Sequence, residues 1–174
     1  MSTETEDSIW IRHLPRSKMR YPRRLVDRAK YVLWRAYTPA HPLVHGAART
    51  LGLKPRSFGV HTERGRQNFH LGYIAPHIQM QKFVNHMVAQ GFANHFVAWK
   101  DESELVSLRR VENFTYQYHI RIFKDGEVRG HYEYTPECYP MSHIRAIGQE
   151  DRPQEFARMF GAHVVSRGSK GVVN

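Results

Sequence analysis

Hydrophobic and polar residues alternate along two neighbouring stretches of this chain, which are separated by Lys124-Asp125-Gly126. Alternation of this kind over several residues is typical of a half-buried β-strand. A three-residue loop that ends in glycine predicts a type I turn followed by a bulge with the glycine in the left-handed conformation. The pattern therefore predicts a β-hairpin over residues 114–137 whose register is fixed by its loop.

The loop determines which side chains of the hairpin face one another. Counting outward from it pairs six polar residues on one face, namely Arg121 with Arg129, His119 with His131 and Gln117 with Glu133. The other face carries Tyr116, Tyr118, Ile120, Ile122, Val128, Tyr132 and Tyr134. A two-residue loop would shift the pairing by one position and place apolar side chains opposite polar ones. We expect the apolar face to be core beneath a helix; the alternative is an exposed tyrosine platform on which bases stack.

Apolar residues at helical spacing predict helices over residues 24–37, 76–90 and 152–160. Short runs between turn residues predict further strands over residues 57–62, 67–74, 93–100 and 105–110. The predicted fold is α+β, with an antiparallel sheet of about six strands, the C-terminal four forming a meander, and helices packed on one face. Residues 1–23 are predicted to be an acidic tail followed by a basic extended arm, 24–165 a single domain and 166–174 a flexible tail.

Positive charge is concentrated in the first third of the chain. The net charge is +10, and residues 8–62 hold twelve Lys and Arg residues against one acid, Asp27. A local excess of this size favours an anionic partner, and we predict a nucleic-acid-binding protein. The arm, the first helix and the 57–74 hairpin would supply contacts from Arg12, Arg16, Lys18, Arg20, Arg23, Arg24, Arg28, Arg35, Arg64 and Arg66. The polar hairpin face would add Gln117, Arg121 and Arg129.

The helix predicted over residues 24–37 has three possible roles. It could lie on nucleic-acid phosphates, lie on an anionic membrane surface, or pack on the sheet with its basic side chains in water. Its apolar stripe consists of Leu25, Val26, Ala29, Val32, Leu33, Ala36 and Tyr37. The arm before it is basic and interrupted by prolines rather than amphipathic, which favours the phosphate backbone over the membrane.

The polar hairpin face also supports an enzymatic alternative. His119 and His131 could act as general acid and base on a phosphate-bearing or other anionic substrate, with Glu133 orienting them and Arg121 and Arg129 holding the anion. Arg121 opposite Arg129 is unfavourable unless Glu127, Glu133, a neighbouring strand or a bound anion relieves the repulsion. A metal-dependent version would use His119, His131, Glu133 and His143 as ligands. A third possibility is a basic subunit of a larger assembly.

Several classes of protein do not fit this sequence. No apolar run reaches the roughly 18 residues of a membrane-spanning helix, and the acidic start is unlike a secretory or transit peptide. The single cysteine, Cys138, cannot form an internal disulfide, so a cytoplasmic location is expected, and we interpret the thiol as non-catalytic. No cofactor is predicted, because the chain carries no P-loop, GxSxG, HExxH or dinucleotide motif.

Overall fold

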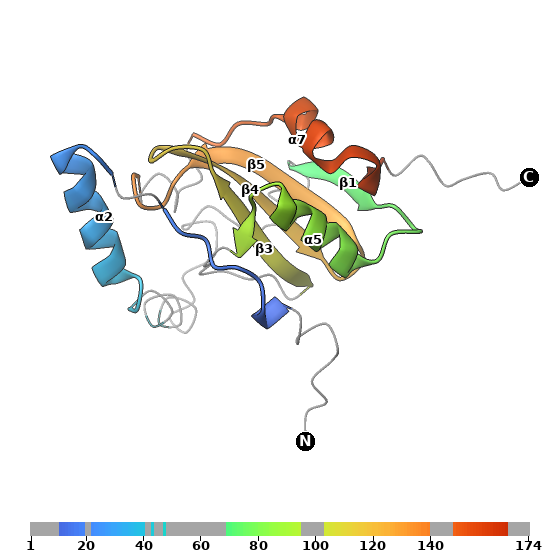
Figure 1. Cartoon of the computed structure of the whole chain (residues 1–174), viewed down its shortest axis with the longest axis horizontal. Helices are drawn as coiled ribbons and strands as arrows, with labels where there is room; N and C mark the ends of the chain where they lie inside the picture. Colours follow the sequence, from blue (N-terminus) through green and yellow to red (C-terminus); the bar gives the residue numbers. More distant parts are fainter. Residues whose placement is uncertain are drawn as a thin grey trace, which may run out of the picture.

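A computed structural model describes residues 11–19, 22–40, 43, 47, 69–94, 103–139 and 148–166. These residues form an open antiparallel sheet of six strands together with helices, which confirms the α+β prediction (Figure 1). The element order is α2 (Leu25–Tyr37), β1 (His70–Ile74), α5 (Met80–Ala89), β2 (Ala93–Asn94), β3 (Glu104–Val111), β4 (Tyr116–Phe123), β5 (Glu127–Tyr134), α7 (Pro153–Phe160), a 3-10 turn η2 (Gly161–His163) and β6 (Val164–Val165). In the sheet the strands lie in the order β2-β3-β4-β5-β1-β6, so the predicted four-strand meander is present.

The register predicted from the hairpin loop is confirmed. Tyr118 faces Tyr132, Ile120 faces Gly130 and the three predicted polar pairs face each other across β4 and β5. Gly126 has φ of +83°, and its N–H donates to the carbonyl of Phe123 at 2.9 Å. That left-handed conformation is one that glycine adopts readily, which is why the loop chemistry fixes the pairing.

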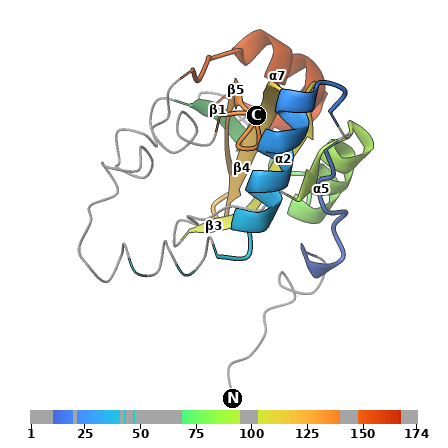
Figure 2. The same cartoon turned by 90° about the vertical axis from the view of Figure 1, so that its left-hand side faces the viewer.

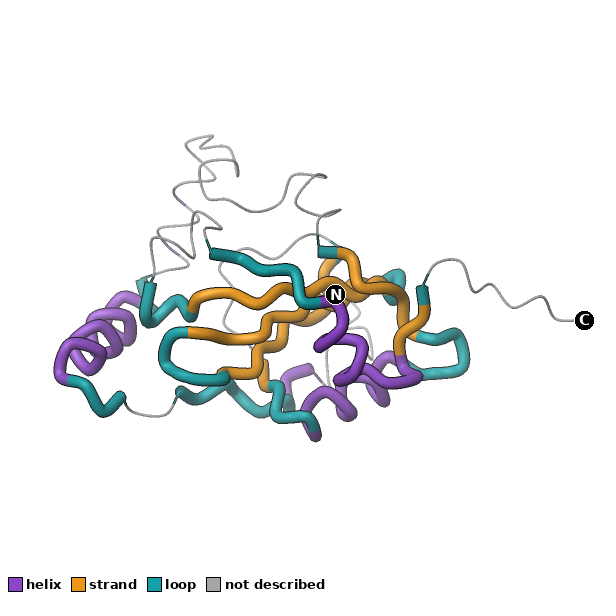
Figure 3. The backbone as a smooth tube through the Cα atoms, turned by 90° about the horizontal axis from the view of Figure 1, so that it is seen from above, coloured by secondary structure: helices purple, strands orange, loops and turns teal. Residues whose placement is uncertain are grey.

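The core lies between the apolar face of the sheet and two helices, α5 and α7, which cover the same side (Figures 1 and 3). The fully buried Phe83 on α5 packs edge-on against Phe160 of α7, with ring centroids 5.7 Å apart. From the sheet side the hairpin contributes Tyr118, Ile120, Ile122, Val128 and Tyr132. The prediction that this face is core is therefore confirmed, and the helices over it exclude a base-stacking platform at its centre.

Gly130 interrupts the apolar face in the middle of β5 for a steric reason. A Cβ at this position would lie 2.9 Å from the carbonyl oxygen of His119 and 2.9 Å from Cδ1 of Leu71. Leu71 reaches in from β1 and occupies the space that a side chain would need. The glycine thus allows β1 to pack closely beside the hairpin, and it explains the one gap in the alternating pattern.

Several element boundaries differ from the sequence predictions. The second helix begins at Met80 rather than at residue 76, because Ala75 and Ile78 first close a turn through a 2.8 Å backbone hydrogen bond. Within the strand predicted over 67–74, the structure contains β1 at His70–Ile74. Within that predicted over 93–100, the described residues form β2 at Ala93–Asn94. The predicted strand over 57–62 lies outside the described residues.

The basic arm docks against the edge of the sheet. Asn94 of β2 donates its N–H to the carbonyl of Pro15 at 2.8 Å and accepts the N–H of Ser17 at 3.0 Å, so Arg16 forms a parallel bridge to β2. Leu14 is buried in the core beside this contact. Residues 15–19 are extended as predicted, and the first described residues, Ile11 and Arg12, belong to a helical turn.

Helix α2 spans the predicted residues but does not join the core. It lies beyond one end of the sheet, apart from α5 and α7 (Figure 1), and it stands in front of the sheet when that end faces the viewer (Figure 2). Its apolar residues Leu25, Val26, Val32 and Leu33 are 81%, 66%, 54% and 71% exposed. Helices α5 and α7 thus pack together on one face as predicted, whereas α2, for which packing on the sheet was only one of three possible roles, buries no residue. No helix within the described ranges is long and apolar enough to cross a membrane.

Candidate functional site

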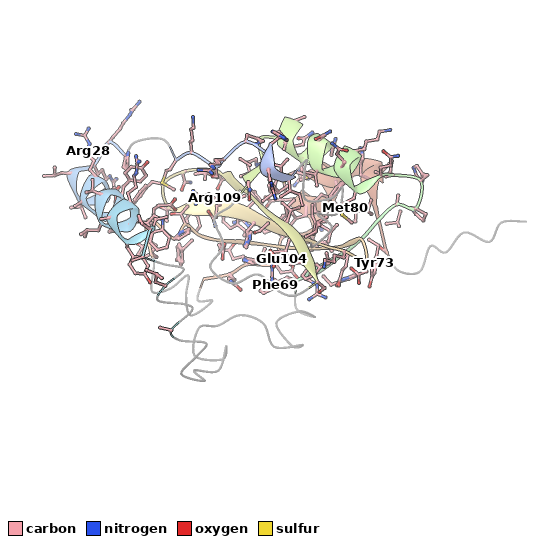
Figure 4. All side chains as sticks on the ribbon, turned by 90° about the horizontal axis from the view of Figure 1, so that it is seen from below. Arg28, Phe69, Tyr73, Met80, Glu104 and Arg109 are labelled. Atoms are coloured by element: carbon pink, nitrogen blue, oxygen red, sulfur yellow. The ribbon has the colours of Figure 1, made fainter. Side chains whose placement is uncertain are left out.

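The polar face of β3, β4 and β5 is buried, so Gln117, Arg121 and Arg129 do not form the exposed binding surface that the prediction of nucleic-acid contacts requires. It lies on the side of the sheet opposite α5, where Figure 4 places Phe69 and Glu104. The two alternating strands predicted six residues of this face, and all six are buried: Gln117, His119, Arg121, Arg129, His131 and Glu133. Their burial means that each charge must be neutralised or hydrogen bonded within the protein.

Arg121 and Arg129 are neutralised by carboxylates from the protein itself. The Arg121 guanidinium donates to Glu104 of the neighbouring strand β3, with its Nε 2.8 Å from Oε2. Arg129 donates through Nε and Nη2 to the two oxygens of Glu127, at 2.8 and 2.5 Å. Both guanidiniums also lie over the ring of Phe123. A neighbouring strand and Glu127 thus relieve the repulsion between the two arginines, and these buried pairs do not present an open anion site.

Arg109 of β3 forms a third buried ion pair at the other end of the face. Its two terminal nitrogens donate to both oxygens of Glu137, at 3.0 and 2.8 Å. The same guanidinium donates to Oε1 of Gln117 at 3.1 Å and to the hydroxyl of Ser17 at 2.5 Å. Arg109 therefore connects the arm, the sheet and the turn after β5 through one side chain.

Between these ion pairs lies the predicted cluster of His119, His131 and Glu133. Nδ1 of His119 is 3.3 Å from Nε2 of His131 and 3.2 Å from Oε1 of Glu133. Nε2 of His131 is 2.9 Å from Oε2 of Glu133. The three residues are only 6%, 8% and 2% exposed. We call this arrangement the His-His-Glu triangle.

Further polar groups hold the triangle in place. The Ser107 hydroxyl lies 2.6 Å from Nε2 of His119, the nitrogen that points away from the triangle. Glu133 accepts hydrogen bonds from the side-chain amides of Gln117 at 2.8 Å and Gln149 at 3.3 Å. The ring of Phe69 lies 4.7 Å from that of His131 and covers it.

Burial lowers the pKa of His119 to about 4, even though its hydrogen bond to Glu133 opposes the shift. Removal of an imidazolium from water is costly, so the neutral form is favoured. Near neutral pH His119 therefore offers a nitrogen lone pair. Such a nitrogen can accept a proton or bind a metal ion.

Most predicted cationic contacts that the structure describes are exposed. Arg12, Arg16, Lys18, Arg23, Arg24, Arg28 and Arg35 all lie on the surface of the arm or α2. Arg20, Arg64, Arg66 and the possible fourth ligand His143 lie outside the described residues. The predicted residues thus separate into an exposed cationic surface and a buried polar face.

An aromatic stack lies at the end of the hairpin next to α2. Tyr116 stacks on Tyr132 and Tyr134, with ring centroids 5.2 and 5.1 Å away. Tyr116 and Tyr134 are half-buried, and Tyr139 beside them is exposed. The ammonium of Lys30 lies 5.0 Å from the centroid of the Tyr139 ring, which connects α2 to the stack.

Sequence reasoning missed several residues of the buried face. Ser107 and Arg109 follow from alternation along β3, once its pairing with β4 is known. Glu137 and Gln149 lie outside the strands, so no periodic signal marks them. Cys138 is buried, which raises the pKa of its thiol, in agreement with a non-catalytic role.

The Glu127 carboxylate should make the fold sensitive to acid. Burial raises its pKa, but hydrogen bonds from Arg129 and His70 outweigh this effect, and the net pKa lies below the ordinary 4.5. A lowered folded-state pKa means that the stabilisation is present above the unfolded value and is lost as the pH falls through the folded one. Urea unfolding should therefore show stability decreasing below about pH 4.5, and less steeply in Glu127→Gln.

Neither a family model, a curated protein nor a solved structure matches this chain. The chemistry of the exposed cationic surface and of the buried triangle is therefore what bears on function.

Proposed function

We propose that this protein binds nucleic acid through a cationic surface formed by its N-terminal arm and α2. The observation that carries the proposal is the exposure of seven cations over residues 12–35, a segment whose only acid is Asp27. Phosphate backbones are bound mainly by such Lys and Arg side chains, which release condensed counterions on contact. The buried Arg121 and Arg129 have no part in this surface.

The tyrosine stack supports a contact with bases beside the phosphates. Tyr116 and Tyr134 are half-buried, Tyr139 is exposed, and Lys30 of α2 lies over the Tyr139 ring. Bases stack on aromatic rings without regard to sequence, and cationic grooves next to such rings are typical of proteins that bind single strands. We therefore expect single-stranded nucleic acid to bind more tightly than a duplex of equal length.

Salt-dependent binding tests the proposal. Fluorescence anisotropy with a labelled single-stranded oligonucleotide should show log affinity falling linearly with log salt, by about 0.7 for each phosphate neutralised. Replacing Arg23, Arg24 and Arg28 by glutamine should lower the slope by about 2, since three phosphate contacts are removed.

The matched control removes the same charge elsewhere. Lys82, Lys124 and Arg158 are exposed on α5, the hairpin loop and α7, and none of them belongs to the arm or α2. Their triple glutamine variant should bind nearly as tightly as the wild-type protein. Equal losses in the two triple variants would mean that only net charge matters, and the proposed surface would have to be abandoned.

An anionic membrane surface is a second candidate, favoured by the exposed apolar stripe of α2. Leu25 and Leu33 are exposed to water beside Arg24, Arg28 and Arg35, which is the composition of a helix that lies in a membrane interface. Vesicles of phosphatidylcholine with about 30% phosphatidylserine provide the test. If α2 binds lipid, Val32→Ser with Leu33→Ser abolishes sedimentation with vesicles and leaves oligonucleotide binding unchanged.

A further inference from the structure

We propose that His119, His131 and Glu133 bind a divalent transition-metal ion, of the Zn²⁺ or Fe²⁺ class. The three residues come from adjacent strands, and their candidate ligand atoms all lie within 4.8 Å of one another. The proposal goes beyond nucleic-acid binding and does not depend on it.

The spacing of the ligand atoms fits a metal ion. The two imidazole nitrogens lie 3.3 Å apart, and each lies near a different oxygen of Glu133, at 3.2 Å for His119 and 2.9 Å for His131. Metal–nitrogen and metal–oxygen bonds of about 2.0–2.2 Å with angles between about 90° and 109° require ligand atoms about 2.8–3.6 Å apart. The separations in the triangle fall within this range, so both imidazoles and the carboxylate lie close enough together to bind one ion.

The groups around the triangle are those that orient metal ligands. When a histidine binds a metal through one ring nitrogen, its other ring nitrogen usually forms a hydrogen bond. That hydrogen bond determines which nitrogen faces the ion. In His119 that role falls to the Ser107 hydroxyl, 2.6 Å from Nε2, so Nδ1 points into the triangle. The amides of Gln117 and Gln149 hold the Glu133 carboxylate.

The charge of the buried face also favours a cation. The described and buried residues of this face include four carboxylates and three guanidiniums. They are Glu104, Glu127, Glu133 and Glu137, and Arg109, Arg121 and Arg129. The carboxylates thus outnumber the guanidiniums by one. The three arginines contact Glu104, Glu127 and Glu137, whereas Glu133 lies against the two histidines. A cation at the triangle would therefore lie directly beside the carboxylate of Glu133.

The donor set narrows the choice of metal. Two imidazoles and one carboxylate suit Zn²⁺, Fe²⁺, Co²⁺ or Ni²⁺, whereas Mg²⁺ and Ca²⁺ prefer oxygen ligands alone. Three protein ligands on one side of an ion leave at least one coordination position for water or a substrate. A site of this composition is thus of the reactive rather than the closed structural kind.

The competing explanation is that hydrogen bonds alone, without a metal ion, hold the three side chains together. In that case each imidazole donates an N–H to Glu133, and the cluster is a buried hydrogen-bond network without affinity for metal. Only the first explanation predicts that the protein binds an added metal ion at this cluster, so a measurement of metal binding distinguishes the two.

The test uses the untagged full-length chain, freed of metal by chelator and titrated with Zn²⁺ against a chromophoric competitor. We expect one tightly bound ion per chain, and at least about a hundredfold weaker binding in His131→Gln. Ser107→Ala should weaken binding by about 10–100-fold, because it removes an orienting partner rather than a ligand.

His70→Gln is the matched control, since His70 pairs with Glu127 at 2.7 Å on the same face and is not part of the triangle. It should bind the ion as tightly as the wild-type protein. The chain has twelve histidines, so weak uptake elsewhere is expected and would respond to neither substitution. No stoichiometric uptake, or equal affinity in His131→Gln and the wild type, would overturn the proposal.

If His131→Gln does not fold, the wild-type protein still decides the matter. Cu²⁺ bound at the triangle should show couplings to two imidazole nitrogens by pulsed electron paramagnetic resonance. Coupling to one imidazole or to none would contradict the proposed ligand set.

Discussion

Replacing Arg109 by methionine should lower the free energy of unfolding by about 3–5 kcal/mol, a loss typical of breaking a buried ion pair. The Arg109 guanidinium is buried and holds both oxygens of Glu137, so its removal leaves that carboxylate buried without its cation. Urea-induced unfolding followed by circular dichroism measures the effect. For a chain of this length the melting temperature should fall by about 6–20 °C.

A double variant separates the cost of a stranded charge from the value of the pair. Changing Glu137 to leucine together with Arg109→Met removes both charges, and it should recover much of the stability lost in the single variant. Arg109→Lys should be destabilised nearly as much as Arg109→Met, because an ammonium group cannot form the two parallel hydrogen bonds that the guanidinium donates to Glu137. A single variant that loses less than about 1 kcal/mol would show that Arg109 is not buried as described.

Replacing Phe83 by alanine should cost about 3–5 kcal/mol of stability, the range observed for aromatic residues in cores. Phe83 is fully buried on α5, and it contacts Phe160 of α7 over the sheet. The cavity would open where the two helices meet, so both should loosen from the sheet. Thermal unfolding and amide hydrogen exchange on α5 and α7 measure the loss.

Phe83→Leu is the control for this prediction. Leucine keeps most of the apolar volume, so its cost should be well below that of alanine. The alanine variant should leave oligonucleotide affinity nearly unchanged, because α2 lies apart from this interface (Figure 1) and the cations of the arm are exposed rather than part of the core. Equal costs for leucine and alanine would indicate that the ring packs loosely.

The hairpin register could be predicted because local chemistry determined it. Gly126 fixes the loop, the loop fixes the pairing, and the pairing brings His119 opposite His131. The side of the sheet that becomes core also followed, since only one face carried Ile120 and Ile122. For these elements the local and global preferences agree.

The position of α2 and the burial of the polar face could not be predicted in the same way. Helical periodicity shows which side of α2 is apolar, but not whether that side finds a partner. Likewise, alternation separates two faces of a sheet without indicating what covers each one. Arg109 and Glu137 meet across separate elements, so their pairing depends on tertiary contacts that no sequence spacing encodes.

The docking of residues 15–17 on Asn94 also protects the sheet against self-association. Asn94 belongs to the outermost strand of the sheet, and the arm occupies backbone groups that would otherwise be available to another chain. A shortened chain that begins after Lys18 would present this strand as an open template for intermolecular pairing. Such a truncated chain should precipitate or form oligomers. The contribution of the arm's charge to nucleic-acid binding therefore has to be tested by substitutions, and the role of its backbone at the sheet edge by truncation.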